Sequence, residues 1–329
     1  MSNKYRNLFL AFGVVAIVIM LFSFDMEYDE LLGNLKKAGY WFPAVLLLWV
    51  VMYAMNALAW YVIIRNDKKN NIPFMKVYKF TISGFALNYA TPVGLMGGEP
   101  YRIMETTPYL GAAKATSSVI LYVMMHIFSH ICFWFASIFF FMALYPVKWA
   151  VGVMLVIVGA FCLLAIYFFS KGYKSGMAVK GLRIAARIPF LRKKVSRFAE
   201  EKKELLLRID NQIAELHSQH KKTFYGSLGL EFMTRILGCL EIYFIMNILT
   251  TDVSFAACIL IQSFSSLFAN LFFFSPMQLG AREGGLAIAA GGMSISGGYG
   301  VYAGLITRVR EFIWIVIGML LMKVGNRKK

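Results

Sequence analysis

Five long stretches of the sequence contain no Asp, Glu, Lys or Arg, and each is about as long as a helix that crosses a bilayer. They cover residues 7–24, 40–64, 115–144, 149–170 and 253–279. Two further apolar stretches, 224–249 and 299–322, carry charges. Hydrophobic residues make up 59% of the 329 residues, which is more than a soluble domain contains. The sequence therefore predicts an all-α polytopic membrane protein.

The first of these stretches is longer than the apolar core of a signal peptide. The segment SFDMEYDE that follows has no small-x-small cleavage site, so we expect a retained helix. The four cysteines all lie in apolar stretches and form no C-x-x-C pair: Cys132, Cys162, Cys239 and Cys258. They indicate packing residues rather than disulfides or a zinc site, and we expect neither a metal nor another cofactor.

Positive charge lies mainly between the apolar stretches and at the ends of the chain. Lys and Arg number 34 against 17 Asp and Glu, a net charge of +17. Lys4, Arg6, the loop at 65–79, the segment at 171–222 and the tail KVGNRKK carry much of it. Such residues are enriched in cytoplasmic loops and attract anionic lipid headgroups. We therefore expect cytoplasmic N- and C-termini, anionic lipids as partners of the basic segment, and no nucleic acid as a partner.

The basic segment at 171–222 places apolar residues at three-, four- and seven-residue steps. This spacing is typical of an amphipathic helix that lies on the cytoplasmic membrane surface. A solvated linker between two halves of the protein is the alternative. The segment has no Gly-rich nucleotide loop and no Ser/His/Asp or Cys/His set, so we expect transport that is downhill or coupled to an ion.

The order of basic and apolar segments predicts two re-entrant hairpins. The chain is inside at Lys79 and again at Lys114, so residues 80–113 must cross an even number of times within a short length. The same count applies to 253–298, which must leave from and return to the outside. The first excursion is expected to be a hairpin with its turn at TPVGLMGGEP, while the second is either a shallow hairpin or two full helices.

The two turns resemble each other, because TPVGLMGGEPYR and SPMQLGAREGG both have a Pro followed three residues later by Leu and seven later by Glu. We interpret them as matching parts of a first repeat at 1–148 and an inverted second repeat at 149–329. Each repeat would be helix, helix, broken hairpin, helix, giving about six full crossings and two hairpins in a single transmembrane domain. Such repeats are typical of alternating-access transporters. A chance match between two Gly/Pro-rich loops is the alternative.

Charged side chains within a membrane are costly and mark candidate sites, and the first group lies at the first turn. Pro100 suits the first position of a new helix, which would place Glu99 at its cap after a flexible Gly97–Gly98 approach. Arg102 lies one turn further on. We expect this helix start and Arg102 to bind a lipid phosphate.

The second turn contributes Arg282 and Glu283. Glu99 and Glu283 are expected to face a cationic headgroup; alternatively, they only cap their own helices and pair with Arg102 and Arg282. Arg310 has no nearby partner in its own helix, so it is expected to contact a phosphate or a Glu of the other repeat.

Further buried charges are spaced for ion pairs within one helix. Glu231 and Arg235 are four apart, and Arg308 and Glu311 are three apart. Glu105 and Glu241 are two more candidates. His126 and His130 are also four apart and share a helix face. They could bind a metal or relay a proton, but no third ligand is identifiable, which favours hydrogen bonding between helices.

The first turn with its GGEPYR, the second Pro followed by GARE, and the closing LITRVREFIWIVIGMLL resemble the lysylphosphatidylglycerol synthase transmembrane region. This is the flippase-like domain found in the multiple peptide resistance factor. The resemblance covers nearly the whole chain and implies a bacterial inner-membrane protein that moves a phospholipid, or an aminoacylated derivative of one, between leaflets. It also suggests a homodimer and a separate lipid-modifying enzyme as partners.

The chain departs from the full-length factor, which follows this region with a soluble aminoacyl-transferring domain. We therefore expect no lysyltransferase activity and no catalytic residues in this chain. Two alternatives to a flippase remain: an embedded lipid-headgroup transferase, for which Glu99 and Glu105 are the only candidate acid/base pair, and a transporter of small solutes or ions.

Overall fold

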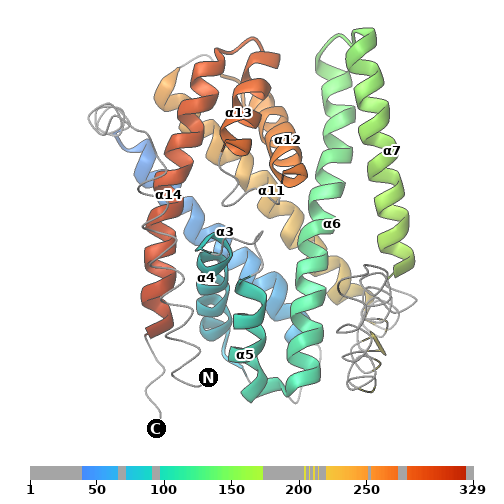
Figure 1. Ribbon diagram of the computed structural model, residues 1–329, viewed down its shortest axis with the longest axis vertical. Helices are drawn as coiled ribbons and strands as arrows, with labels where there is room; N and C mark the ends of the chain where they lie inside the picture. Colours follow the sequence, from blue (N-terminus) through green and yellow to red (C-terminus); the bar gives the residue numbers. More distant parts are fainter. Residues whose placement is uncertain are drawn as a thin grey trace, which may run out of the picture.

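The computed structural model describes residues 39–65, 72–90, 97–172, 220–250, 253–272 and 280–323, with five isolated positions between 204 and 214. These ranges form nine helices and no strands (Figure 1). The helices are α3 (Trp41–Ile64), α4 (Phe74–Ala90), α5 (Gly98–Leu110), α6 (Ala112–Leu144), α7 (Trp149–Gly172), α11 (Lys221–Leu249), α12 (Phe255–Leu271), α13 (Ala281–Gly292) and α14 (Gly297–Lys323). The all-α prediction is confirmed for this part of the chain.

Within the described residues, four helices are long and apolar enough to cross a membrane: α3, α6, α7 and α11. α14, with 27 residues, is also long enough, but it carries three buried charged residues at its middle. The first crossing expected at 7–24 and most of the basic segment at 171–222 lie outside the described residues. The chain is therefore a polytopic membrane protein.

Four shorter helices form two hairpins. α4 and α12 have 17 residues each, α5 has 13 and α13 has 12, which corresponds to about 18 to 26 Å. None reaches the roughly 30 Å of a hydrocarbon core. In Figure 1, α4 and α5 occupy the lower half of the molecule, and α12 and α13 occupy the upper half. The second excursion is therefore a hairpin of partial depth, like the first.

Helix contacts in the first half have counterparts in the second. α5 packs on α6 as α13 packs on α14, and α3 packs on α4 as α11 packs on α12. The long helix after each hairpin also contacts the other hairpin: α6 touches α12, and α14 touches α4. This is the pattern expected of an inverted repeat.

α14 approaches α4 closely at Gly318. A Cβ at this position would lie 2.5 Å from the Ala86 Cβ and 3.0 Å from the Ile82 carbonyl oxygen, so a larger residue would push the helices apart. The hydroxyl of Ser83 donates to the Gly318 carbonyl at 2.9 Å. α14 is thus held against the first hairpin at one end and, through α13, against the second hairpin at the other.

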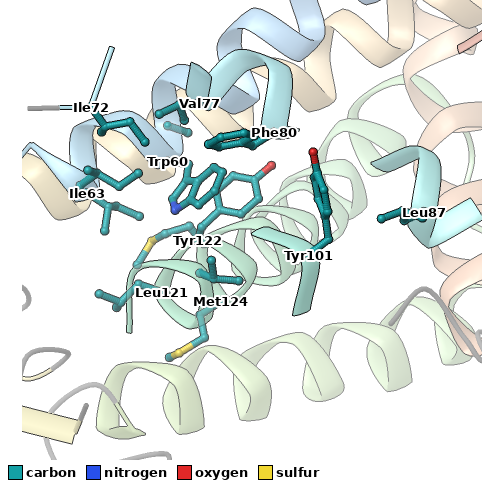
Figure 2. Close-up of a cluster of buried hydrophobic side chains, with 14 of the residues drawn as sticks. Trp60, Ile63, Ile72, Val77, Phe80, Leu87, Tyr101, Leu121, Tyr122 and Met124 are labelled. Atoms are coloured by element: carbon teal, nitrogen blue, oxygen red, sulfur yellow. The ribbon is translucent and has the colours of Figure 1, made fainter. Parts of the chain in front are cut away.

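The helices differ in how much of their surface is buried. An aromatic core lies where α3, α4, α5 and α6 meet, around Trp60, Phe80, Tyr101 and Tyr122 (Figure 2). α7 instead packs mainly on α6 and is almost entirely exposed along its apolar length. Its exposed apolar side chains suit contact with lipid tails.

Candidate functional site

Buried charges gather at three places in the described helices. We call them the α13–α14 network, the Arg102 pocket and the α6–α11 cluster. The network contains Arg282, Glu283, Arg308, Arg310 and Glu311, with Glu241 from α11. The pocket surrounds one arginine of α5, and the cluster contains His126, His130, Glu231 and Arg235.

The α13–α14 network joins the first turn of α13 to the middle of α14. Arg308 Nε donates to Glu283 Oε1 at 2.8 Å, and Arg308 Nη1 donates to Glu311 Oε2 at 3.2 Å. Arg282 forms an ion pair with Glu311. Glu283 also accepts from the Gly280 N–H at 2.9 Å and so caps its own helix. The Arg308–Glu311 pair expected from their spacing is present, Glu283 pairs with Arg308, and Arg282 pairs with Glu311.

Arg310 completes the network on another side of α14. Its Nε donates to Glu241 Oε1 at 2.9 Å, and its guanidinium carbon lies 3.8 Å from the centre of the Trp49 ring. Glu241 belongs to α11, and Glu311 of α14 itself lies 3.7 Å from Arg310 Nη1. Both are in the same half of the chain, so the expectations of no nearby partner in its own helix and of a Glu from the other repeat are wrong. The first half supplies the Trp49 ring instead. Three arginines face three glutamates, and the network is formally neutral.

Arg102 lies in a pocket of aromatic rings and is only 1% exposed. Its guanidinium carbon is 4.8 Å from the Phe85 ring centre, 5.2 Å from Tyr122 and 5.9 Å from Trp60. Its nearest carboxylate oxygen is Glu99 Oε1, at 3.6 Å. In this conformation Arg102 is therefore enclosed by protein groups and is not presented to a lipid phosphate.

The start of α5 differs from the expectation. The helix begins at Gly98, so Pro100 is its third residue rather than its first. Gly98 is needed for close packing, because a Cβ there would overlap the Gly84 carbonyl oxygen of α4. The Gly98 N–H donates to Asn88 Oδ1 at 2.6 Å, and Asn88 Nδ2 donates to Glu99 Oε1 at 3.0 Å. Asn88 thus holds the two arms of the first hairpin together.

The α6–α11 cluster contains the ion pair expected from spacing, with Arg235 Nη2 2.9 Å from Glu231 Oε2. His126 and His130 of α6 both contact it: His126 Nδ1 lies 2.8 Å from Glu231 Oε2, and His130 Nε2 lies 2.7 Å from Arg235 Nη1. The expected hydrogen bonding between helices is therefore present. The described residues contain no group of three or more His, Cys, Asp or Glu that could hold a metal ion.

Aromatic side chains that were not among the residues predicted from the sequence connect these three places. Tyr53 of α3 lies between Trp49 and Phe85, at centroid distances of 5.1 and 5.5 Å. Trp49 contacts Arg310 and Phe85 contacts Arg102, so a row of rings joins the network to the pocket. Trp49 and Tyr53 are four apart in an uncharged helix, which is the signal that could have identified them.

The two hairpins contact each other where α4 ends and α13 begins. The Arg282 guanidinium carbon of α13 lies 5.9 Å from the Tyr89 ring of α4. The segments around Pro92 and Pro276, which were expected to meet near the midplane, lie outside the described residues. The structure thus brings Arg282, Glu283 and Arg310 into one network and places Gly97, Gly98, Glu99 and Arg102 in a separate group.

The carboxylates considered for a transferase do not share a helix face. Glu99 and Glu105 are six residues apart in α5, which places them about 120° apart around the helix axis. Glu105 is buried and one of its oxygens has no hydrogen-bond partner within the described residues. The arrangement offers no shared acid/base position.

Comparison with known proteins gives one family. The family model described as "Lysylphosphatidylglycerol synthase TM region" matches residues 8–318. No curated protein and no solved structure matches the chain.

Proposed function

Because the chain belongs to the lysylphosphatidylglycerol synthase transmembrane-region family, we propose that it is a flippase-like lipid transporter. It would move a phospholipid, or an aminoacylated derivative of one, between the leaflets of a bacterial inner membrane. The basic loops would face the cytoplasm, with both termini on that side.

The observation that carries this proposal is the pair of partial-depth hairpins in opposite halves of the molecule, which meet at Tyr89 and Arg282. Alternating access needs a site that each side of the membrane can reach in turn. Glu99 accepts from Asn88 and so joins α5 to α4 within the first hairpin, while Glu283 accepts from Arg308 and so joins the second hairpin to α14. Opening one hairpin would expose its charges to one leaflet while the other hairpin stays closed.

The substrate class follows from the partly exposed charges. The side chains of Glu99, Glu283 and Arg282 are 26%, 14% and 16% exposed. A lipid whose headgroup carries both a phosphate and an ammonium group would match a carboxylate beside an arginine at a helix N-terminus. The acyl tails would remain in the bilayer against the apolar surfaces of α6 and α7.

We do not assign a transferase reaction to these residues. A transferase needs an acid and a base directed at one reacting atom. Glu99 and Glu105 lie on different faces of α5, and nothing else in the described helices supplies such a pair near the hairpin openings.

The test is transbilayer movement of labelled lipids in proteoliposomes. Wild-type protein should move the lysyl derivative of phosphatidylglycerol, whose headgroup carries both groups, faster than it moves in protein-free vesicles. Arg282→Gln should slow this movement at least about tenfold, since it removes a charge-assisted phosphate contact. Lys323→Gln is the matched control, because it removes one exposed positive charge at the end of α14. Movement no faster than in empty vesicles would reject the proposal, and mass spectrometry of the same lipids would detect a headgroup reaction.

A further inference from the structure

The α6–α11 cluster has a hydrogen-bond pattern that fixes some protons and leaves others free to change. An arginine only donates, so His130 Nε2 must accept from Arg235 Nη1, and the proton of a neutral His130 is on Nδ1. His126 is different. Its Nδ1 lies 2.8 Å from Glu231 Oε2, which accepts, and 3.0 Å from Arg235 Nη2, which donates.

His126 can therefore hold either of two charge states without moving. When neutral, its Nδ1 can accept from Arg235 or donate to Glu231. When doubly protonated, Nδ1–H donates to Glu231, and Nε2 carries the second proton. None of the described residues hydrogen-bonds Nε2, and the side chain as a whole is 27% exposed.

Two buried atoms in the cluster have no hydrogen-bond partner among the described residues. They are Glu231 Oε1 and His130 Nδ1. Buried polar atoms are normally paired, because an unpaired one destabilises the folded state. A cluster that served only to join α6 to α11 would be expected to satisfy both atoms. They leave one acceptor on Glu231 and one ring nitrogen on His130 available beside His126.

We propose that His126, together with Glu231 and Arg235, is a proton-binding site that couples lipid movement to a transmembrane proton gradient. This inference rests on the lipid transport proposed above. The proton adds to the lone pair of an imidazole nitrogen, and no other bond is made or broken. The fully buried Glu231 carboxylate favours a cation at this position and disfavours a lipid phosphate. The Arg235 guanidinium, in contact with both histidines, disfavours a metal ion.

The charged and titratable groups around His126 come from three helices. α11 supplies Glu231 and Arg235, and α6 supplies His130 and Tyr122. α5 contributes Arg102, which contacts the same Tyr122 ring. The α3 and α12 helices contain no Asp, Glu, Lys, Arg or His, and neither does the Trp149–Ser170 span of α7.

The connection to the first hairpin passes through Phe85. This α4 ring lies 6.0 Å from the His126 ring and 4.8 Å from the Arg102 guanidinium carbon. A proton on His126 places a second positive charge beside a ring that already holds one. Repulsion between the two charges weakens the packing of Arg102, and with it the contact of α5 with α4. Proton binding would thus favour opening of the first hairpin.

Histidine protonation can be measured directly, without any lipid movement. The chain has only four histidines, so NMR signals of ¹⁵N-histidine-labelled protein in nanodiscs can be assigned by single substitutions. The His126 signal should change with pH between two states, with one and with two ring protons. In Glu231→Gln it should protonate only at lower pH, because the opposing carboxylate is lost. A His126 signal that stays in one state throughout would overturn the site.

Coupling is measured as the ratio of lipid-movement rates with and without an imposed pH gradient. In the wild type, the rate with the gradient should be several-fold higher than the rate without it. A protonophore should return this ratio to one. His126→Gln should give a ratio of one whatever its absolute rate. His220→Gln, at the start of α11, is the control and should keep the wild-type ratio.

The outcomes separate the two proposals. Lipid movement by the wild type at a ratio of one would overturn the coupling and leave the lipid transport standing. No lipid movement under any condition would reject both, and the NMR titration would still decide whether His126 binds a proton.

Discussion

The ring of Tyr89 lies 5.9 Å from the guanidinium carbon of Arg282, and this contact joins two hairpins that belong to opposite halves of the molecule. Tyr89 is the last residue but one of α4, and Arg282 is the second residue of α13. The contact therefore lies between the C-terminal end of α4 and the N-terminal end of α13. Any motion that separates the hairpins must break it.

A covalent link at this contact should stop transport. In a cysteine-free background, Tyr89→Cys and Arg282→Cys would be joined by a short bifunctional thiol reagent. Because loss of Arg282 alone should slow transport, the unlinked double variant is the reference: we expect the cross-link to abolish the lipid movement that remains in it, and reductive cleavage of the reagent to restore that rate. Each single cysteine variant treated with the same reagent is the control. Unchanged movement in the fully linked protein would show that the hairpins need not separate.

Glu283→Gln should affect lipids according to their charge. The substitution keeps the shape of the side chain and removes its negative charge. If Glu283 faces an ammonium group of the substrate, a cationic lipid should lose at least about tenfold in rate, and a zwitterionic lipid should lose less. The measurement compares both labelled lipids in the same proteoliposome preparation. An equal loss for both lipids would assign Glu283 to capping α13 alone.

Gly98→Ala should destabilise the protein strongly. The added Cβ would overlap the Gly84 carbonyl oxygen, which belongs to the backbone and cannot turn aside. We expect a loss of about 3 kcal/mol or more in the free energy of unfolding, seen as a lower Tm in detergent. Gly229→Ala is the matched control in α11, where a Cβ meets no atom within 4 Å. It should be neutral or stabilise by about 0.5 to 1 kcal/mol.

The Arg310–Glu241 pair should show strong energetic coupling. Glu241→Gln leaves a buried arginine whose next carboxylate oxygen, on Glu311, is 3.7 Å away. We expect a loss of about 3 kcal/mol for this variant and for Arg310→Gln. The double variant should lose clearly less than the sum, because neither charge is then left alone. Additive losses in a double-mutant cycle of chemical unfolding would contradict a direct pair.

Cysteine labelling tests the orientation in the membrane. Single cysteines placed in the basic segment at 171–222 should react with an impermeant reagent only from the cytoplasmic side. Cysteines at 25–30 should react only from the outside. The positive-inside rule gives this assignment, and labelling of the basic segment from outside would reverse it.

The order of helices and hairpins over the described residues could be predicted because it depends on local properties of the sequence. Charge-free stretches such as 115–144 identify single helices, and the basic loops fix where each must begin and end. The Glu231–Arg235 pair was also predictable, since both residues lie on one helix and their spacing alone brings them together. The start of α5 was misplaced because Gly98 already packs on Gly84, a contact across the hairpin that no local pattern records.

The partners of the remaining charges could not be predicted, because they are chosen by packing between helices. Arg282 pairs with Glu311, 29 positions along the chain, although Glu283 is its neighbour in sequence. Arg102 was expected to face a phosphate, yet rings from α3, α4 and α6 enclose it. Only the fold places those rings around one guanidinium.

The close packing of α14 on both hairpins has a consequence for the electrical insulation of the membrane. Gly318 holds one end of α14 against α4, and the charged network holds its middle against α13. A stiff helix that tilts away from one hairpin presses more tightly on the other. In the proposed transport cycle the two hairpins would then not open together, and a passage continuous from one side to the other would not form. A lipid could change leaflets without letting ions leak, so the membrane potential would survive each transport cycle.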